Sequence, residues 1–255
     1  MSFDLISLTG IALLGGALGF AGGLFGIGGG IVAVPVLALL FGMSQPVAHG
    51  TALVMMVPNL LIACWRYARL NPIPLWEGLG VAFTATLSTW LSAQVANSID
   101  QRLLRSLFAV FLLIVAARMF LKIESEGRSG ALIDRRFSPL VGIAGGLSMG
   151  LLGVGGGLVT APLFSRLFDL PQRVSQSLGL AVVTPSALIA LSAYAGHGNV
   201  DWLTGLCLAA SGAVTVSSGV TLAHKLPDRQ LKLVFSAMLA VTAAWLLVGH
   251  WVMKA

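Results

Sequence analysis

The stretch GLFGIGGGIVAVP, Gly23–Pro35, decides how this chain is expected to fold. It places four glycines among five consecutive residues, Gly26–Gly30, inside an otherwise apolar run. A glycine-rich loop that opens a helix binds phosphate in many soluble proteins. In a membrane protein, the same glycines allow the backbone to turn or two helices to approach closely. The remainder of the sequence decides between these two interpretations.

The composition is that of a membrane protein. Of the 255 residues, 57% are hydrophobic and 9% are charged, and the mean hydropathy is +0.93. Soluble domains carry roughly a quarter charged residues, so this set cannot cover a water-exposed surface. The sequence therefore predicts an all-α polytopic membrane protein, because several apolar segments approach the ~20 residues of a bilayer-spanning helix. These segments are Leu5–Phe25, Pro46–Trp65, Leu75–Ala96, Leu103–Leu121, Leu140–Leu152, Leu178–Ala195, Leu203–Ala223 and Leu231–Val252.

Other features exclude several classes of protein. The first residues, Met1–Asp4, carry no Lys or Arg, so we expect a retained helix and not a signal peptide. Cys64 and Cys207 lie in apolar segments without the spacing of a disulfide or a metal site, so no cofactor and no metal are expected. The net charge of +6 comes from basic residues that lie singly or in pairs between apolar segments, which indicates membrane topology and not nucleic-acid binding.

The glycine motif occurs twice. GIGGGIVAVP, Gly26–Pro35, recurs 127 residues later as GVGGGLVTAP, Gly153–Pro162, identical at six of ten positions. We therefore predict a first transmembrane repeat over 1–121, a polar cytoplasmic linker over 122–136 and a second transmembrane repeat over 137–255. Further pairs match at the same offset, namely Gln45 with Gln172, Pro58 with Pro185, Tyr67 with Tyr194, Arg102 with Arg229, and Phe108 with Phe235.

The distribution of charge predicts that the two repeats have opposite orientations. If the connections alternate sides and the amino terminus lies outside, 12 of the 15 basic residues fall on the inner side. Corresponding loops carry opposite biases: 42–45 has no basic residue and 166–173 has two. Each half must then cross the membrane an odd number of times, which makes the halves inverted repeats, with both termini periplasmic. This plan recurs in secondary transporters, whose binding sites lie near the midplane.

The segment 28–41 is too short to span a bilayer, so we expect a half-helix opened by the glycines. The backbone N–H groups of the two glycine turns would then converge on a central site for a small anion, because a helix start carries partial positive charge. These glycines are Gly28, Gly29, Gly30, Gly155, Gly156 and Gly157. A Walker loop is excluded, since Ile31-Val32 and Leu158-Val159 stand where Lys-Ser/Thr would be needed. The structural alternative is close helix packing by small residues.

Each glycine motif is followed by a helix with small polar residues, HGTAL at His49–Leu53 and SQSLGL at Ser175–Leu180. In this combination, over essentially the whole chain, the sequence resembles the TauE/SafE family of membrane permeases. The resemblance implies transport of small sulfur-containing anions, such as sulfite and organosulfonates, across the bacterial cytoplasmic (inner) membrane. It does not specify which anion is transported.

Seven polar side chains inside these helices complete the predicted substrate-binding set, because polar groups at membrane depth face the protein interior. They are His49, Thr51, Asn59, Gln176, Ser177, Thr184 and Ser186. For the Ser and Thr residues, hydrogen bonding to the helix backbone is the alternative. His49 is a candidate proton relay or, alternatively, a histidine at headgroup level. Tyr67 and Tyr194, with several tryptophans, are expected at the membrane interface.

The nine acidic residues all lie at or near segment ends, which argues against a cation pump or cation channel. The predicted function is therefore a secondary transporter for a small anion that works by alternating access. An anion channel and a membrane-embedded enzyme or maturation factor are the alternatives, and no catalytic residues are expected. The expected partners are the anion and the lipid bilayer, with no nucleic acid. A coupling proton or ion and a homodimer are left open.

Overall fold

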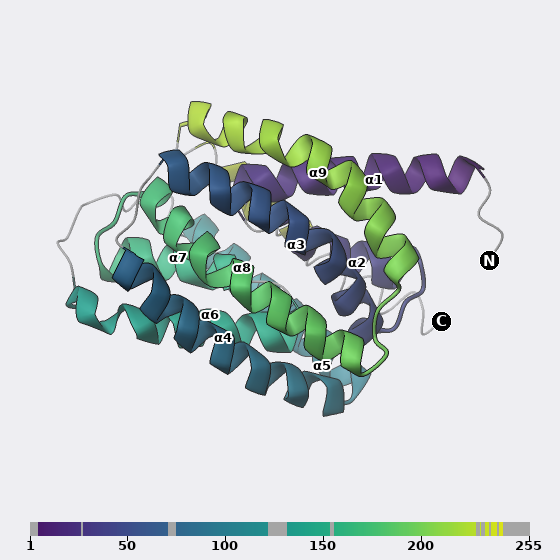
Figure 1. The fold of residues 1–255 in the computed structure, drawn as a ribbon, viewed down its shortest axis with the longest axis horizontal. Coiled ribbons are helices and arrows are strands. Elements are labelled where there is room, and N and C mark those ends of the chain that lie inside the picture. Colours follow the sequence, from purple (N-terminus) through teal and green to yellow (C-terminus); the bar gives the residue numbers. More distant parts are fainter. Residues whose placement is uncertain are drawn as a thin grey trace.

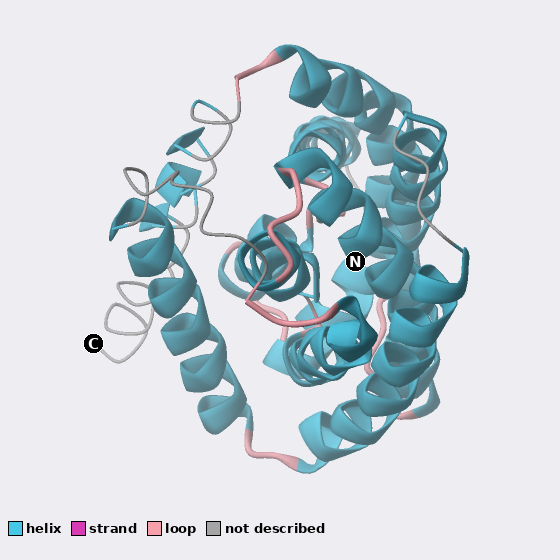
Figure 2. Ribbon diagram, turned by 90° about the vertical axis from the view of Figure 1, so that its left-hand side faces the viewer, coloured by secondary structure: helices cyan, strands magenta, loops and turns pink. Residues whose placement is uncertain are grey.

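A computed structural model describes residues 5–26, 28–70, 75–121, 132–153 and 156–227, together with isolated positions between 230 and 241. The described residues form helices and no strand (Figures 1 and 2). The elements are α1 Leu5–Phe25, α2 Gly30–Leu39, α3 Gln45–Leu70, α4 Leu75–Ser98, α5 Gln101–Leu121, a 3-10 turn Arg135–Phe137, α6 Ser138–Leu152, α7 Gly156–Leu167, α8 Gln172–Gly196 and α9 Trp202–Lys225. The all-α prediction is confirmed.

The helices have the dimensions of membrane segments. Within the described part of the chain, three of them are long and apolar enough to cross a bilayer, namely Gln45–Leu70, Val174–Gly196 and Trp202–Lys225. Large apolar side chains are exposed along their outer faces and those of their neighbours, among them Leu13, Phe83 and Val214, each more than 70% exposed. A bilayer would cover such a surface.

The element boundaries recur with the 127-residue spacing of the glycine motifs. α4 and α9 each contain 24 residues and begin at Leu75 and Trp202. The short helices α2 and α7 contain 10 and 12 residues. At 1.5 Å per residue, such a helix covers about half of a bilayer core. Most of the predicted linker 122–136 lies outside the described residues.

The most extensive helix contacts join the two halves of the chain. α1 packs along α9, and α6 packs along α4. Glycines spaced by four residues form one face of each pair: Gly15, Gly19 and Gly23 on α1, and Gly142, Gly146 and Gly150 on α6. A Cβ atom at any of them would overlap backbone or side-chain atoms of the partner helix, so these glycines serve close packing.

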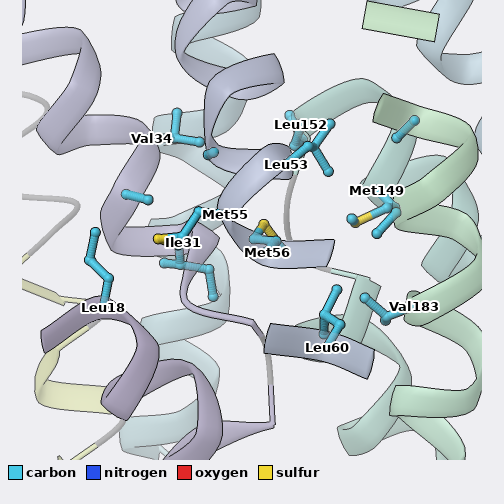
Figure 3. Close-up of a cluster of buried hydrophobic side chains, with 14 of the residues drawn as sticks. Leu18, Ile31, Val34, Leu53, Met55, Met56, Leu60, Met149, Leu152 and Val183 are labelled. Carbon is cyan, nitrogen blue, oxygen red and sulfur yellow. The ribbon is translucent and has the colours of Figure 1, made fainter. Parts of the chain in front are cut away.

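α3 and α8 form the centre of the bundle and run antiparallel. The first turns of α3 contact the last turns of α8 through His49 and Tyr194, and the opposite ends meet through Tyr67 and Gln176. Between these polar contacts the interface is largely apolar, with a hydrogen bond between the Cys64 and Thr184 side chains. Figure 3 shows Leu60 of α3 beside Val183 of α8 within the largest buried cluster.

Candidate functional site

The first glycine turn is buried in the protein interior. Gly28 and Gly29 have φ angles of 72° and 83°, a left-handed conformation that favours glycine. Gly29 caps α2, whose first hydrogen bond runs from the Ala33 N–H to the Gly29 carbonyl at 3.2 Å. A Cβ on Gly29 would overlap the carbonyl oxygen of Leu18 on α1. The turn therefore needs glycine both for its conformation and for its closeness to α1.

The second turn has a similar setting. Gly153 follows α6 with a φ angle of 62°, and the buried Gly156 and Gly157 are the first residues of α7. A Cβ on Gly156 would lie 2.8 Å from the Val183 side chain. Gly155 lies outside the described residues. The two short helices thus begin at Gly30 and Gly156, as the glycine motifs predict.

Both turns pack against the centre of the α3–α8 pair. A Cβ on Gly28 would lie 2.9 Å from Leu60 and 3.3 Å from Met56 of α3, and Gly156 lies against Val183 of α8. Met56, Leu60 and Val183 lie together in one buried cluster (Figure 3). The structure therefore brings both turns to one central cluster, with apolar side chains between them, which the sequence did not predict.

A polar network closes one end of the α3–α8 pair, here called the His49 end. The Gln45 side-chain amide nitrogen lies 3.0 Å from His49 Nε2, and His49 Nδ1 lies 3.3 Å from the Tyr194 hydroxyl. Tyr194 donates to the Gly150 carbonyl of α6 at 3.3 Å. His49 is fully buried, and the Phe108 ring lies against its imidazole at 5.6 Å. His49 thus lies in the protein interior and does not face the lipid.

The opposite end, here called the Tyr67 end, carries the corresponding contact of the other half. The Tyr67 hydroxyl donates to Gln176 Oε1 at 3.3 Å, and the Ser177 hydroxyl donates to the Tyr67 carbonyl at 3.4 Å. Tyr67 and Tyr194 are 1% and 0% exposed, so the prediction that they lie at the membrane interface is wrong. Their hydroxyl groups find partners between helices, which allows both rings to be buried. Trp65 and Trp202 are half-exposed, and Trp251 lies outside the described residues.

The remaining hydroxyl residues of the predicted set bond to backbone. Thr184 and Ser186 donate to the carbonyls of Leu180 and Val182 in their own helix, at 2.7 and 2.9 Å. Thr51 accepts from the Asp201 N–H at 2.9 Å and so connects α3 to the start of α9. These contacts agree with the structural alternative, although a hydroxyl that donates to a carbonyl can still accept a hydrogen bond.

Asn59 is different, because neither its side-chain nitrogen nor its oxygen has a hydrogen-bond partner although the residue is fully buried. Its amide lies against Gly212 of α9, and the next residue toward the amino terminus is Pro58 inside α3. The proline has no N–H for the Val54 carbonyl. An unpaired amide in an apolar interior is costly, so Asn59 is the strongest candidate among the described polar residues for bonding a ligand.

Charged and metal-binding groups are scarce in this region. No three His, Cys, Asp or Glu side chains among the described residues lie close enough to hold a metal ion. Asp100, Asp134, Asp169 and Asp201 lie between helices, and Glu77 lies in the first turn of α4. The candidate site therefore offers neutral donors: backbone N–H groups at two helix starts, amides and hydroxyls.

Several residues of the site were not predicted from the sequence. The sequence does not predict Gln45 or Met56 as site residues, and it predicts Tyr194 at the membrane surface. The pairing of Tyr67 with Tyr194 at the 127-residue offset was a usable signal, because the partner positions of each tyrosine, Gln176 and His49, match at the same offset. The antiparallel packing of α3 and α8 needed to exploit it is visible only in three dimensions.

Comparison with known proteins gives a consistent result. A family model described as sulfite exporter TauE/SafE matches residues 11–246. A probable membrane transporter protein of Methanocaldococcus jannaschii is 26% identical, with 96% of this chain and 97% of the relative covered. Similar proteins of Bacillus subtilis (22% identical, 93% and 96% covered) and Haemophilus influenzae (27%, 91% and 96%) are also named probable membrane transporter proteins.

Proposed function

Because the chain belongs to the TauE/SafE family of membrane transporters, we propose that it is a secondary transporter for a small oxyanion, with sulfite and organosulfonates as the first candidates. The protein is a multi-pass membrane transporter. The cargo, the binding site and the alternating-access mechanism are the proposal. The observation that carries it is that two glycine turns, each opening a short helix, pack against one central cluster of α3 and α8.

Inverted repeats are part of the proposal, and the packing of the helices supports them. The α3–α8 pair is antiparallel, and its two polar contacts exchange when 127 is added to or subtracted from each residue number. The α1–α9 and α6–α4 pairs follow the same exchange: Thr215 donates to the Gly16 carbonyl at 2.6 Å, and Ser88 donates to the Ile143 carbonyl at 3.3 Å. An inverted arrangement gives each half the same surroundings.

The proposed orientation places the Tyr67 end in the cytoplasm and both termini in the periplasm of a bacterial inner membrane. Basic side chains gather where α3 and α9 end and α6 begins, the same end of the bundle in Figure 1. These residues are Arg66, Arg69, Arg135, Arg136 and Lys225. Cytoplasmic ends of membrane helices carry such an excess of Lys and Arg.

The chemistry of the site favours a small anion. The starts of α2 and α7 present free N–H groups and the positive end of a helix dipole. Asn59, which follows Pro58 in α3, would add an amide that has no protein partner and lies against Gly212 of α9. Fixed cations are absent from the described part of this centre, so binding by neutral donors suits an ion that must also be released.

Entry of the anion requires the central side chains to move. Met56 and Leu60 cover the first turn, and Val183 covers the second. Methionine adapts readily to a new space because it is unbranched and flexible. Separation of α3 and α8 at one end, while the other end stays closed, would expose the centre to one side of the membrane at a time. A closed apolar centre favours such a carrier over a continuously open channel.

The test is flux into proteoliposomes that contain the purified protein. Sulfite, thiosulfate, small sulfonates and small carboxylates are offered in turn, and uptake is measured with the same anion or none inside. We expect saturable uptake of at least one of these anions, which is accelerated by internal anion and reduced at least tenfold by Asn59→Leu. Thr86→Val is the matched control, because the Thr86 hydroxyl donates to the Ala82 carbonyl of its own helix, α4, at the outside of the bundle.

Two results would contradict the proposal. Single-channel conductance in a planar bilayer would indicate a channel. Uptake of none of the anions by a protein that remains monodisperse would exclude the proposed cargo.

A further inference from the structure

The two ends of the α3–α8 pair differ in the group that the buried tyrosine hydroxyl contacts, although the His224 imidazole of α9 also lies against the Tyr67 ring, with 4.8 Å between the ring centroids. At the Tyr67 end, the tyrosine hydroxyl bonds to Gln176, which does not titrate. At the His49 end, the corresponding contact is made by an imidazole. His49 and Gln176 match at the 127-residue offset, so one of two equivalent positions carries a group that can bind a proton.

The hydrogen bonds at the His49 end require a neutral ring. The Tyr194 hydroxyl has one hydrogen, which it donates to the Gly150 carbonyl, so it accepts from His49 Nδ1–H. Gln45 presents its amide nitrogen to His49 Nε2 at 3.0 Å, so this ring nitrogen is the acceptor. A protonated ring would have a hydrogen on Nε2 facing the N–H groups of Gln45, and the contact would be repulsive.

A second observation at the same place points to proton binding. Gln45 Oε1 is buried and has no hydrogen-bond partner. Rotation of the Gln45 amide would turn this oxygen toward Nε2, where it could accept a hydrogen bond from the imidazolium. The buried acceptor that a charged His49 needs is therefore present in the closed structure and unused.

Among the residues that the structure describes, His49 has no titratable partner besides Tyr194. Tyr194 is the titratable group that faces it from α8, and α5 presents Phe108. The Asp201 carboxylate at the start of α9 accepts hydrogen bonds from the Thr204 N–H and hydroxyl, and His197 bonds to the Ala193 carbonyl. The described residues of α2 and α6 contain no titratable side chain. A proton that affects this contact would bind to His49.

We propose that His49 is the proton-binding residue of the protein, and that its protonation opens the His49 end of the α3–α8 pair. This inference rests on the proposed alternating-access function and adds that the proton acts on one of the two ends. Separation of the helices exposes His49 to water, where it can be charged, whereas the closed arrangement with the Gln45 amide nitrogen against Nε2 requires the neutral ring. Acid therefore favours the state that is open at the His49 end.

The experiment measures opening without measuring transport. Ala48→Cys places a thiol on the fully buried residue beside His49, in a chain in which Cys64 and Cys207 are replaced by alanine. The rate of labelling by a hydrophilic maleimide is measured in nanodiscs from pH 8 to pH 5. The same series with His49→Gln corrects for the pH dependence of the thiol itself, and Gln is the residue that the other end already uses.

We expect the ratio of labelling rates, His49 over His49→Gln, to increase as the pH falls, by up to about tenfold per pH unit where the ring titrates. A ratio that does not change with pH would overturn the proposal. If the protein transports none of the tested anions, the pH dependence of the labelling ratio is still expected. Failure of the proposed function and failure of this inference are therefore distinguishable.

The reciprocal variant does not alter His49. Ser175 corresponds to Ala48, is fully buried and lies beside Gln176. Because His224 lies against the Tyr67 ring, this series is made in a chain that also carries His224→Gln. Ser175→Cys should then show no increase of labelling in acid beyond that of the thiol, and Gln176→His should introduce one. If Gln176→His gives no such increase in a protein that elutes as the parent does, the chemistry proposed for the tyrosine contacts is wrong.

Discussion

Substitution of Gly29 by alanine should lower the stability of the protein by an amount that the structure allows us to divide into two parts. The φ angle of 83° costs a non-glycine residue about 1–2 kcal/mol. The new methyl group would also overlap the Leu18 carbonyl of α1, and backbone atoms cannot rotate away. Overpacking of this kind costs about 1–3 kcal/mol. The expected total loss is therefore about 2–5 kcal/mol.

Gly42 provides the control for the first part. Its φ angle is 64°, but a Cβ atom there would have no neighbour within 4 Å, so Gly42→Ala should cost only the conformational part, about 1–2 kcal/mol. The free energies of unfolding are measured by SDS titration in mixed micelles, followed by tryptophan fluorescence. Equal losses for Gly29→Ala and Gly42→Ala would refute the close packing of the first turn against α1.

Three further predictions concern packing and buried polar groups. Gly146→Leu should prevent recovery of folded, monodisperse protein because the side chain would overlap the Ala85 carbonyl of α4, whereas Gly10→Leu, with no neighbour within 4 Å, should elute as the parent does. Asn59→Leu should leave the free energy of unfolding unchanged or raise it, because the substitution removes an unpaired buried amide. A decrease in this free energy of more than about 1 kcal/mol would mean that the amide has a partner. Tyr194→Phe should cost about 1 kcal/mol or more, because the Tyr194 hydroxyl bonds to both His49 and Gly150; an unchanged free energy of unfolding would contradict these contacts.

Much of the fold could be predicted from the sequence because its strongest signals are local. Runs of apolar residues identify the helices, and the glycine motifs mark where α2 and α7 begin. The 127-residue offset of the motifs agrees with the starts of α4 and α9. The apolar runs and the motifs are each local patterns, and the offset compares two such patterns along the chain, so these features require no knowledge of the packing.

The composition of the site could not be predicted in the same way. Tyr67 and Tyr194 lie near helix ends, where aromatic residues commonly meet the membrane surface, and their burial follows from partners 109 and 145 residues away. The apolar cover of the glycine turns likewise depends on how α3 and α8 cross. Asn59 was selected from its residue type, but only its packing against Gly212 reveals that its amide lacks a partner.

The pairing of α1 with α9 has a consequence for the assembly of the protein during synthesis. α1 is made first, yet the helix that covers its glycine face begins at Trp202. Until the ribosome has passed that point, the face formed by Gly15, Gly19 and Gly23 has no native neighbour in the bilayer. The amino-terminal half should therefore be degraded when it is expressed alone. Coexpression of the two halves as separate chains should restore the amount of both halves in the membrane.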